Sequence, residues 1–302
     1  MKLAYFDDYR LGVVKDDHLV DVTDLVQEIP HVGPHDLISR LIEAFDQYRP
    51  RLEQAAAGGE GIPAARVRFR APLPRPGKMV CMAGNFLENG TLKEPRPINA
   101  FLKNPDAVIG DGDTIHLPDA PATIFHHEAE LGLVIGRKAS RISEDEAYGC
   151  IFGFVNFIDV SARGIGPVGA DTFLPGKSWH TFAPMGPFLV TADDMPDPKA
   201  QDTPVRLWVN GELHQDYSTS DIGHSVPKTL AWISSITTLN PGDLVALGTN
   251  HQGLGALQDG DEVVRETPGL GRLTLHVSDP LGREWPRGID QEMADRIAGR
   301  TR

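Results

Sequence analysis

The sequence predicts an α+β fold in which β-strands predominate. Short apolar runs bounded by Gly, Pro, Asn and Asp recur along most of the 302 residues, a pattern typical of β-strands. Helical periodicity is confined to a few segments, and the strands do not alternate regularly with helices, so we do not expect a doubly wound parallel sheet. A hydrophobic content of 40% is sufficient for a sizeable core in a chain of this length.

The first 70 residues predict a small N-terminal α+β domain. Residues 1–26 alternate short apolar runs with pairs of Asp, which indicates short strands joined by tight turns. Between Leu37 and Leu52 the apolar residues recur at steps of three and four, and two glycines follow, so we expect one helix over about residues 36–57. Prolines at 63, 72, 74 and 76 favour a loop, and we place a domain boundary near residue 70.

Residues 71–281 predict a larger domain rich in strands. The apolar runs that indicate these strands are KMVCMAG, TIHLP, HHEAELGLVIG, GCIFGFVNFIDV, PFLV, VRLWVNGELHQ, DLVALG and GRLTLHV. The Asn210-Gly211 pair between two such runs is a hairpin signal. Two short helices are expected, one begun by a capping box of Ser143 and Glu146 and one with Pro227 in its first turn. Residues 282–302 are a C-terminal tail, for which we expect a short helix.

Charge and cysteine usage exclude several classes of partner. The formal net charge is −13, from 42 acidic and 29 basic residues without a long basic run, so neither nucleic acid nor an anionic membrane surface is an expected partner. Cys81 and Cys150 are too few for a disulfide framework and fit a reducing compartment. No segment has the pattern of a signal peptide or a membrane span. We therefore expect a soluble, cytoplasmic protein that acts on small molecules.

Two acidic residues stand in an otherwise apolar segment, HHEAELGLVIG, residues 126–136. In an extended strand Glu128 and Glu130 share a face. They could lie exposed on an edge strand, but the apolar neighbours favour burial, and buried carboxylates need a cation or donors to neutralise them. Asp159 follows a second apolar strand in a similar setting. Three carboxylates without thiolates suit a hard ion such as Mg²⁺ or Mn²⁺, which would leave positions open for a chelating 2-oxo acid or 1,3-dicarbonyl compound.

Seven motifs in a fixed order resemble the fumarylacetoacetate hydrolase family over about residues 71–278. They are APLPRPGKMVCMAGN (71–85), FLKNPDAVIGDGDTIHLP (101–118), HHEAELGLVIG (126–136), IDVSAR (158–163), GKSWHTFAPMGPFLV (176–190), VNGELHQ (209–215) and LNPGDLVALGT (239–249). The resemblance implies a mixed β-sandwich roll that is usually a homodimer and holds Mg²⁺ or Ca²⁺ through carboxylates. The small N-terminal region is also similar to that of bacterial members of the family.

The resemblance also implies roles for individual residues. The family's E-x-E pair and the Asp of its D-x-S-A-R segment fall on the three acids selected above, which makes them the implied metal ligands. Its active-site Lys falls on Lys177, where an ammonium can bind a substrate carboxylate or stabilise an enolate. Thr249 matches a Thr that meets the substrate carboxylate. Arg163, which ends the matched D-x-S-A-R segment, is assigned to substrate binding as well.

The chain departs from the family where the hydrolases carry the residues that activate water. The family segment G-x-N-Y-x-x-H, with a Glu three residues later, reads MAGNFLENGTLKEP here, so Asn89 replaces the His and Leu92 the Glu. A neutral amide cannot act as a general base near neutral pH but can donate to an oxyanion, so Asn89 is assigned to substrate binding. Glu88, Glu94 and His251 are the candidates for the missing base.

Glycines follow the D-x-S-A-R segment where other residues are expected. Gly164 replaces an acid, and Gly166 occupies the Gln position of some acylpyruvate hydrolases, so the substrate end contacted there should differ. The run GIGPVG, residues 164–169, also satisfies G-x-G-x-x-G. Because Pro167 and the loop-like sequence after it do not open a helix, we interpret this run as a chance match to a dinucleotide-binding motif.

The leading hypothesis is a divalent-metal-dependent hydrolase that cleaves a C–C bond in an acylpyruvate-type 2-oxo acid or diketone, as in the catabolism of aromatic compounds. Lys177, His251 and Glu88 are its candidate catalytic residues. The first alternative is a metal-dependent lyase or isomerase of a 2-oxo acid, such as a decarboxylase, tautomerase or dehydratase, because enolate chemistry needs the metal but not an activated water. The second is a protein that binds metal and ligand without turnover.

Overall fold

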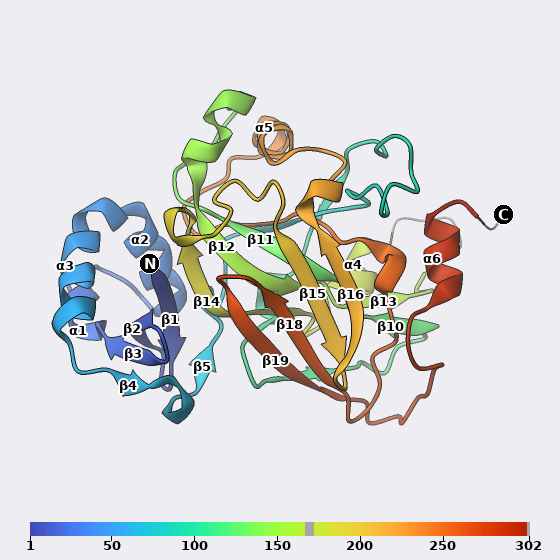
Figure 1. Ribbon diagram of the computed structural model, residues 1–302, viewed down its shortest axis with the longest axis horizontal. Helices are drawn as coiled ribbons and strands as arrows, with labels where there is room; N and C mark the ends of the chain where they lie inside the picture. Colours follow the sequence, from blue (N-terminus) through green and yellow to red (C-terminus); the bar gives the residue numbers. More distant parts are fainter. Residues whose placement is uncertain (167–171, 301–302) are drawn as a thin grey trace.

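The computed structural model describes residues 1–166 and 172–300 (Figure 1). Its α-helices are α1 (Thr23–Val26), α2 (Pro34–Glu43), α3 (Phe45–Gly58), α4 (Phe173–Lys177), α5 (Val226–Ile236) and α6 (Gln291–Ile297). Its 3₁₀ helices are η1 (Ala64–Arg66), η2 (Pro105–Ala107), η3 (Glu144–Cys150), η4 (Ala192–Asp194), η5 (Thr219–Asp221) and η6 (His251–Gly253). Its strands are β1 (Lys2–Phe6), β2 (Arg10–Lys15), β3 (His18–Asp21), β4 (Ile62–Pro63), β5 (Phe69–Arg70), β6 (Met79–Met82), β7 (Ala100–Leu102), β8 (Val108–Ile109), β9 (Thr114–His116), β10 (Ile124–His126), β11 (Ala129–Ile135), β12 (Ile151–Ile158), β13 (Ser161–Arg163), β14 (Ala183–Thr191), β15 (Pro204–Val209), β16 (Glu212–Ser218), β17 (Leu244–Ala246), β18 (Glu262–Thr267) and β19 (Gly271–Ser278). The predicted α+β fold with predominant strands is confirmed.

Two mixed sheets form the body of the molecule. The larger has the order β4-β3-β2-β1-β14-β12-β11-β17-β6-β7, with β5 paired to β1 and β8 to β14. The smaller has the order β16-β15-β18-β19-β9, and a separate two-stranded sheet joins β10 to β13. Most neighbouring strands are antiparallel, but β6 runs parallel to β17, β8 to β14 and β9 to β19. The smaller sheet packs across the middle of the larger one (Figure 1).

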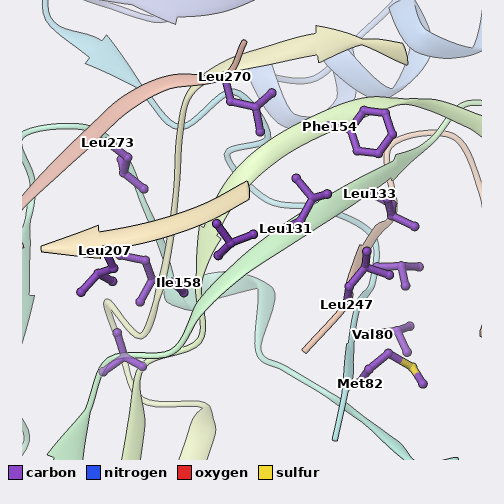
Figure 2. Close-up of a cluster of buried hydrophobic side chains, with 14 of the residues drawn as sticks. Val80, Met82, Leu131, Leu133, Phe154, Ile158, Leu207, Leu247, Leu270 and Leu273 are labelled. Carbon is purple, nitrogen blue, oxygen red and sulfur yellow. The ribbon is translucent and has the colours of Figure 1, made fainter. Parts of the chain in front are cut away.

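The core between the sheets is continuous and apolar. Leu131, Leu133 and Phe154 of the larger sheet belong to one cluster with Leu207 and Leu273 of the smaller sheet (Figure 2). These side chains are almost completely buried. Alternate residues of a strand point to opposite faces, so the apolar positions of β11 and β12 that face this core are fixed by their register.

The N-terminal region differs from its prediction in one respect. We expected a single helix over about residues 36–57, and this is wrong, because the helix is interrupted at Ala44. Ala44 has φ −101° and ψ 15°, outside helical geometry, and its N–H bonds back to Arg40 and Ile42. The turn lets α2 and α3 bury separate apolar faces, since a single straight helix of that length would carry part of its stripe away from the core.

The predicted boundary near residue 70 falls on β5, and the larger sheet is continuous across it. Lys2 and Leu3 of β1 pair with Val190 and Leu189 of β14. The division into residues 1–70, 71–281 and 282–302 therefore stays a prediction about folding units, while the sheet itself links the first two regions.

Several local predictions are confirmed. Asn210 and Gly211 both adopt positive φ, 51° and 81°, as the tight turn between β15 and β16 requires. The capping box of Ser143 and Glu146 opens η3, and Pro227 lies in the first turn of α5. The tail carries α6, and both cysteines are free. Among the helices of residues 1–166 and 172–300, none has the length and apolar character needed to cross a membrane.

Gly153 of β12 lies where no side chain fits. A Cβ atom there would lie 2.0 Å from the carbonyl oxygen of Val190 in β14. We expect Gly153→Ala to lower the free energy of unfolding by about 3 kcal/mol, because backbone must move to admit the methyl group. Gly149→Ala is the matched control, since a Cβ at Gly149 meets nothing within 4 Å. Urea denaturation of both variants measures the difference, and equal midpoints would contradict this account.

Candidate active site

The three acids lie close together where β11 begins and β12 ends. In this antiparallel pair Ala129 lies opposite Ile158 and Glu130 opposite Phe157, so the same register sets Glu128 opposite Asp159. The backbone N–H of Asp159 donates to the carbonyl of Glu128 at 2.8 Å. β10 turns away at this point to pair with β13, and Glu128 lies in the break between β10 and β11. The register thus brings together carboxylates 31 residues apart in the chain.

Glu128, Glu130 and Asp159 form a compact and buried carboxylate cluster. One oxygen from each lies within 4.8 Å of the others, and the residues are 4%, 1% and 1% exposed. Burial, together with the charges of Asp159 and Glu128, raises the pKa of Glu130 well above its usual range. The backbone N–H of Gly248 is a donor to this carboxylate, at 2.9 Å from Oε2. Three buried like charges with hard oxygen donors fit a divalent ion such as Mg²⁺ or Mn²⁺.

Lys177 lies directly on this cluster. Its Nζ is 2.5 Å from Glu128 Oε2, 2.7 Å from Asp159 Oδ2 and 2.6 Å from Ser161 Oγ. Burial alone would lower the pKa of Lys177, but Asp159 and Glu128 outweigh burial and raise it, so the ammonium keeps its charge. The resemblance assigns Lys177 to the substrate, and its place in the cavity allows that role. Lys177 also holds two of the three carboxylates in position.

Other cations neutralise the same acids. Arg163 Nη2 donates to Glu128 Oε1, and Lys103 Nζ lies 2.5 Å from Asp159 Oδ1. Burial alone would raise the pKa of Glu128, but Lys177 and Arg163 outweigh it and hold that pKa well below its usual range. Sequence reasoning missed Lys103, although it stands in a quoted family motif, because nothing local distinguishes it from a surface lysine.

Arg265 of β18 lies beneath the cluster and was also missed. The residue is fully buried, and its Nη2 donates to the backbone carbonyl of Glu130 at 2.9 Å. Burial lowers the pKa of its guanidinium to about 10. Glu130 and Glu266 act against this lowering, so nearby opposite charge offsets part of the cost of burying the guanidinium.

Glu88 and His251, two of the three candidate bases, are in contact. Nδ1 of His251 lies 2.7 Å from Glu88 Oε1, and its backbone N–H donates to Glu88 Oε2 at 2.8 Å. Glu88 is 1% exposed. Since a carboxylate only accepts, the imidazole carries its proton on Nδ1 and leaves the lone pair of Nε2 free to take a proton. This Glu88–His251 pair has the arrangement of a general base and the group that orients it.

A cavity of about 100 Å³ is lined both by His251 of this pair and by the carboxylates of Glu128 and Glu130. Glu128, Glu130, Arg163, Lys177, Thr249 and His251 all line it. The stacked rings of Phe101 and Phe173, with centroids 4.6 Å apart, form an apolar wall. The Thr249 hydroxyl donates to the carbonyl of Ala129 and accepts from Gln215 Nε2, both at 2.8 Å. Most of the residues selected from the sequence are therefore brought together around one small space.

Two selected residues lie elsewhere. Asn89 lines a separate cavity of about 70 Å³, where its Oδ1 accepts from Asn250 Nδ2 at 3.0 Å. Glu94 is exposed on the surrounding loop. The substrate-binding role of Asn89 stays a prediction that this placement does not favour. Part of GIGPVG and its Pro167 lie outside the described residues, so that interpretation also stays a prediction.

Comparisons with known proteins agree with this architecture. A family model described as fumarylacetoacetate (FAA) hydrolase C-terminal matches residues 78–278. The crystal structure of maleylpyruvate hydrolase from Sphingobium sp. SYK-6, in complex with manganese(II) and pyruvate, superposes with a TM-score of 0.82 at 33% identity, covering 92% of this chain and 99% of that one. The predicted mixed β-sandwich roll is thereby confirmed.

Curated relatives include enzymes of more than one reaction type. Maleylpyruvate hydrolase of Aquipseudomonas alcaligenes is 29% identical over 293 residues, covering 92% of this chain and 99% of that protein. Oxaloacetate tautomerase YisK of Bacillus subtilis (strain 168) is 33% identical over 226 residues, covering 70% of this chain and 74% of that protein. The chain belongs to the fumarylacetoacetate hydrolase family.

Proposed function

We propose that this protein is a divalent-metal-dependent hydrolase that cleaves the C–C bond of an acylpyruvate carrying a second carboxylate, in the breakdown of aromatic compounds. The observation that carries the proposal is the contact between His251 Nδ1 and Glu88 Oε1 beside the carboxylate cluster. The family's water-activating His is replaced by Asn89, and the Glu88–His251 pair supplies an equivalent base from other positions in the chain.

The residues of the site can perform this hydrolysis as follows. Nε2 of His251 accepts a proton from water, and Glu88 stabilises the resulting imidazolium. The water oxygen adds to the acyl carbonyl carbon, the C–C bond breaks, and its electron pair leaves as the enolate of pyruvate, which then takes up a proton. Lys177 and Arg163 line the cavity where they can bind carboxylate or enolate oxygens. A divalent ion held by Glu128, Glu130 and Asp159 would polarise the 2-oxo acid and stabilise the enolate charge.

The charge of the site supports an anionic substrate. Among the described residues, Lys103, Lys177, Arg163 and Arg265 contact the three acids or their backbone. With Glu88 these three acids make four carboxylates, which the four cations balance, and a divalent ion would leave two positive charges in excess. A dicarboxylic acylpyruvate, which gains a further negative charge as the enolate forms, balances this field better than a neutral diketone does.

A substrate panel tests the proposal. With Mn²⁺ or Mg²⁺ present, we expect dicarboxylic acylpyruvates to release pyruvate and a carboxylic acid. The pyruvate released is measured by a coupled assay in which a second enzyme reduces it. Acylpyruvates with a single carboxylate should have a kcat/KM lower by roughly tenfold or more, since one charged contact is lost. A neutral 1,3-diketone is the matched control. Equal turnover of the diketone would contradict the assignment of substrate class, and the absence of acid release would contradict hydrolysis.

A keto–enol tautomerase acting on oxaloacetate is the second candidate. The similarity to an oxaloacetate tautomerase favours it, and a base such as the Glu88–His251 pair can also move the proton between carbon and oxygen. A tautomerase is distinguished from a hydrolase because the enol absorbance of oxaloacetate is lost without release of a carboxylic acid. If metal and 2-oxo acids bind without any turnover, the binding-protein alternative holds. Preference for Mg²⁺, a homodimeric state and a cytoplasmic location stay predictions.

A further inference from the structure

The C-terminal segment reaches the site from beyond the residues that the family model matches. α6 lies at the end of the molecule opposite the N-terminal helices (Figure 1). It packs against η6, the turn that carries His251. Gln252 Nε2 donates to the carbonyl of Ala294 at 3.2 Å, and the N–H of Asp290 donates to the carbonyl of Leu254 at 2.7 Å. These hydrogen bonds join the tail to η6 and Leu254, next to His251 in the cavity wall.

Asp290, the residue that caps α6, also contacts the site through a buried histidine. Its Oδ1 accepts the Met293 N–H at 2.9 Å, and its Oδ2 lies 2.9 Å from Nε2 of His126. His126 is fully buried, and its Nδ1 lies 3.2 Å from Nε of Arg163. Arg163 in turn donates through Nη2 to Glu128. One unbroken chain of hydrogen bonds therefore links the tail to the carboxylate cluster.

The donors and acceptors of this chain have a defined direction. A guanidinium nitrogen can only donate, so Nδ1 of His126 must accept from Arg163 and carries no proton. The ring proton then lies on Nε2 and is donated to Asp290. Without an acceptor at Asp290 the other tautomer becomes available, and its Nδ1–H would face the N–H of Arg163. Two donors face to face repel, so the guanidinium would turn from its position.

We propose that Asp290 is a positioning residue, which sets the guanidinium of Arg163 for a substrate carboxylate by fixing the tautomer of His126. Nε and Nη2 of Arg163 are both held by protein groups, while Nη1 has no hydrogen-bond partner among the described residues. Because Arg163 lines the cavity, Nη1 is the donor left for a ligand. The inference rests on the proposed function, since it assumes an anionic 2-oxo acid in that cavity.

Asp290→Ser separates the two roles of the carboxylate. Serine is a good N-cap residue, so α6 keeps its cap, but its side chain is too short to reach His126. The matched control is Asp295→Ser on the same helix, where the carboxylate contacts Gln291 and Arg300 instead of the site. Oxalate, a mimic of the pyruvate enolate, is the probe, and its affinity for Mn²⁺-saturated protein is measured by calorimetry beside KM and kcat.

We expect the Kd of oxalate and the KM to rise about tenfold in Asp290→Ser, with kcat changed much less, because a charge-assisted contact to the bound anion is weakened. Asp295→Ser should match the wild type. Equal oxalate affinity in the two variants would overturn the positioning role alone. If the Mn²⁺-loaded wild type does not bind oxalate at all, the proposed function fails and this inference with it.

If Asp290→Ser does not fold, a measurement on the wild-type protein still tests the inference. The ¹⁵N chemical shifts of the His126 ring distinguish a protonated from an unprotonated nitrogen. We expect the proton on Nε2 in the wild type and, where the variant folds, a shift of the signal toward the other tautomer in Asp290→Ser but not in Asp295→Ser. A wild-type ring protonated on Nδ1 would overturn the proposal.

Discussion

Glu130→Gln is expected to abolish tight binding of Mn²⁺ and Mg²⁺ and to lower turnover by at least about a hundredfold. Glu130 is the member of the cluster whose carboxylate no cationic side chain contacts among the described residues, and burial together with the charges of Asp159 and Glu128 raises its pKa. Its charge is therefore the one that a bound ion would stabilise most. The amide keeps the shape of the side chain and an acceptor for the Gly248 N–H, so the change removes charge and not packing.

Stability measurements separate loss of the ion from loss of the fold. An ion that binds only the folded state at a hundred times its Kd should raise the free energy of unfolding of the wild type by about 2.7 kcal/mol. This increase should vanish in Glu130→Gln, while the metal-free variant should unfold no earlier than the metal-free wild type, because one of three buried like charges is gone. Glu262→Gln, an exposed acid on β18, is the matched control. Full turnover of chelator-treated wild type would contradict the metal requirement.

Removing either member of the Glu88–His251 pair is expected to lower hydrolysis by roughly a hundredfold or more, the usual scale for a general base. His251→Asn removes the base itself. Glu88→Gln can place an amide N–H against Nδ1 of His251, which favours the tautomer with a proton on Nε2 and so blocks the lone pair that takes the proton from water. Steady-state kinetics with a dicarboxylic acylpyruvate measure both losses.

The two residues should act as one unit. The double variant should lose little more than either single variant, because the second change removes a group that no longer functions. Glu94→Gln in the same loop is the matched control, since Glu94 is exposed. A large loss in Glu94→Gln with full activity in His251→Asn would reverse the assignment of the base. Retained tautomerisation with lost hydrolysis in His251→Asn would show that the pair serves water activation alone.

The sequence by itself determined the strands, the hairpin and the choice of the three acids that form the carboxylate cluster. Strand positions follow from local alternation, and the turn at Asn210-Gly211 needs positive φ at both residues, so neighbouring residues suffice to predict them. The three acids could be selected because carboxylates in apolar strands are costly to bury, and the antiparallel register of β11 and β12 then sets two of them opposite each other. The interruption at Ala44 was not predictable in this way, because packing of two helix faces decides it.

The tertiary structure alone decided which side chains complete the site. Glu88 and His251 are 163 residues apart, and the choice between Glu88 and Asn89 depends on how one turn is held. Both have positive φ, and Asp221 accepts the N–H groups of Asn89 and Gly90, which points Asn89 away and leaves Glu88 toward His251. Such contacts between distant segments depend on packing and hydrogen bonding across the whole core. Local periodicity carries no information about them.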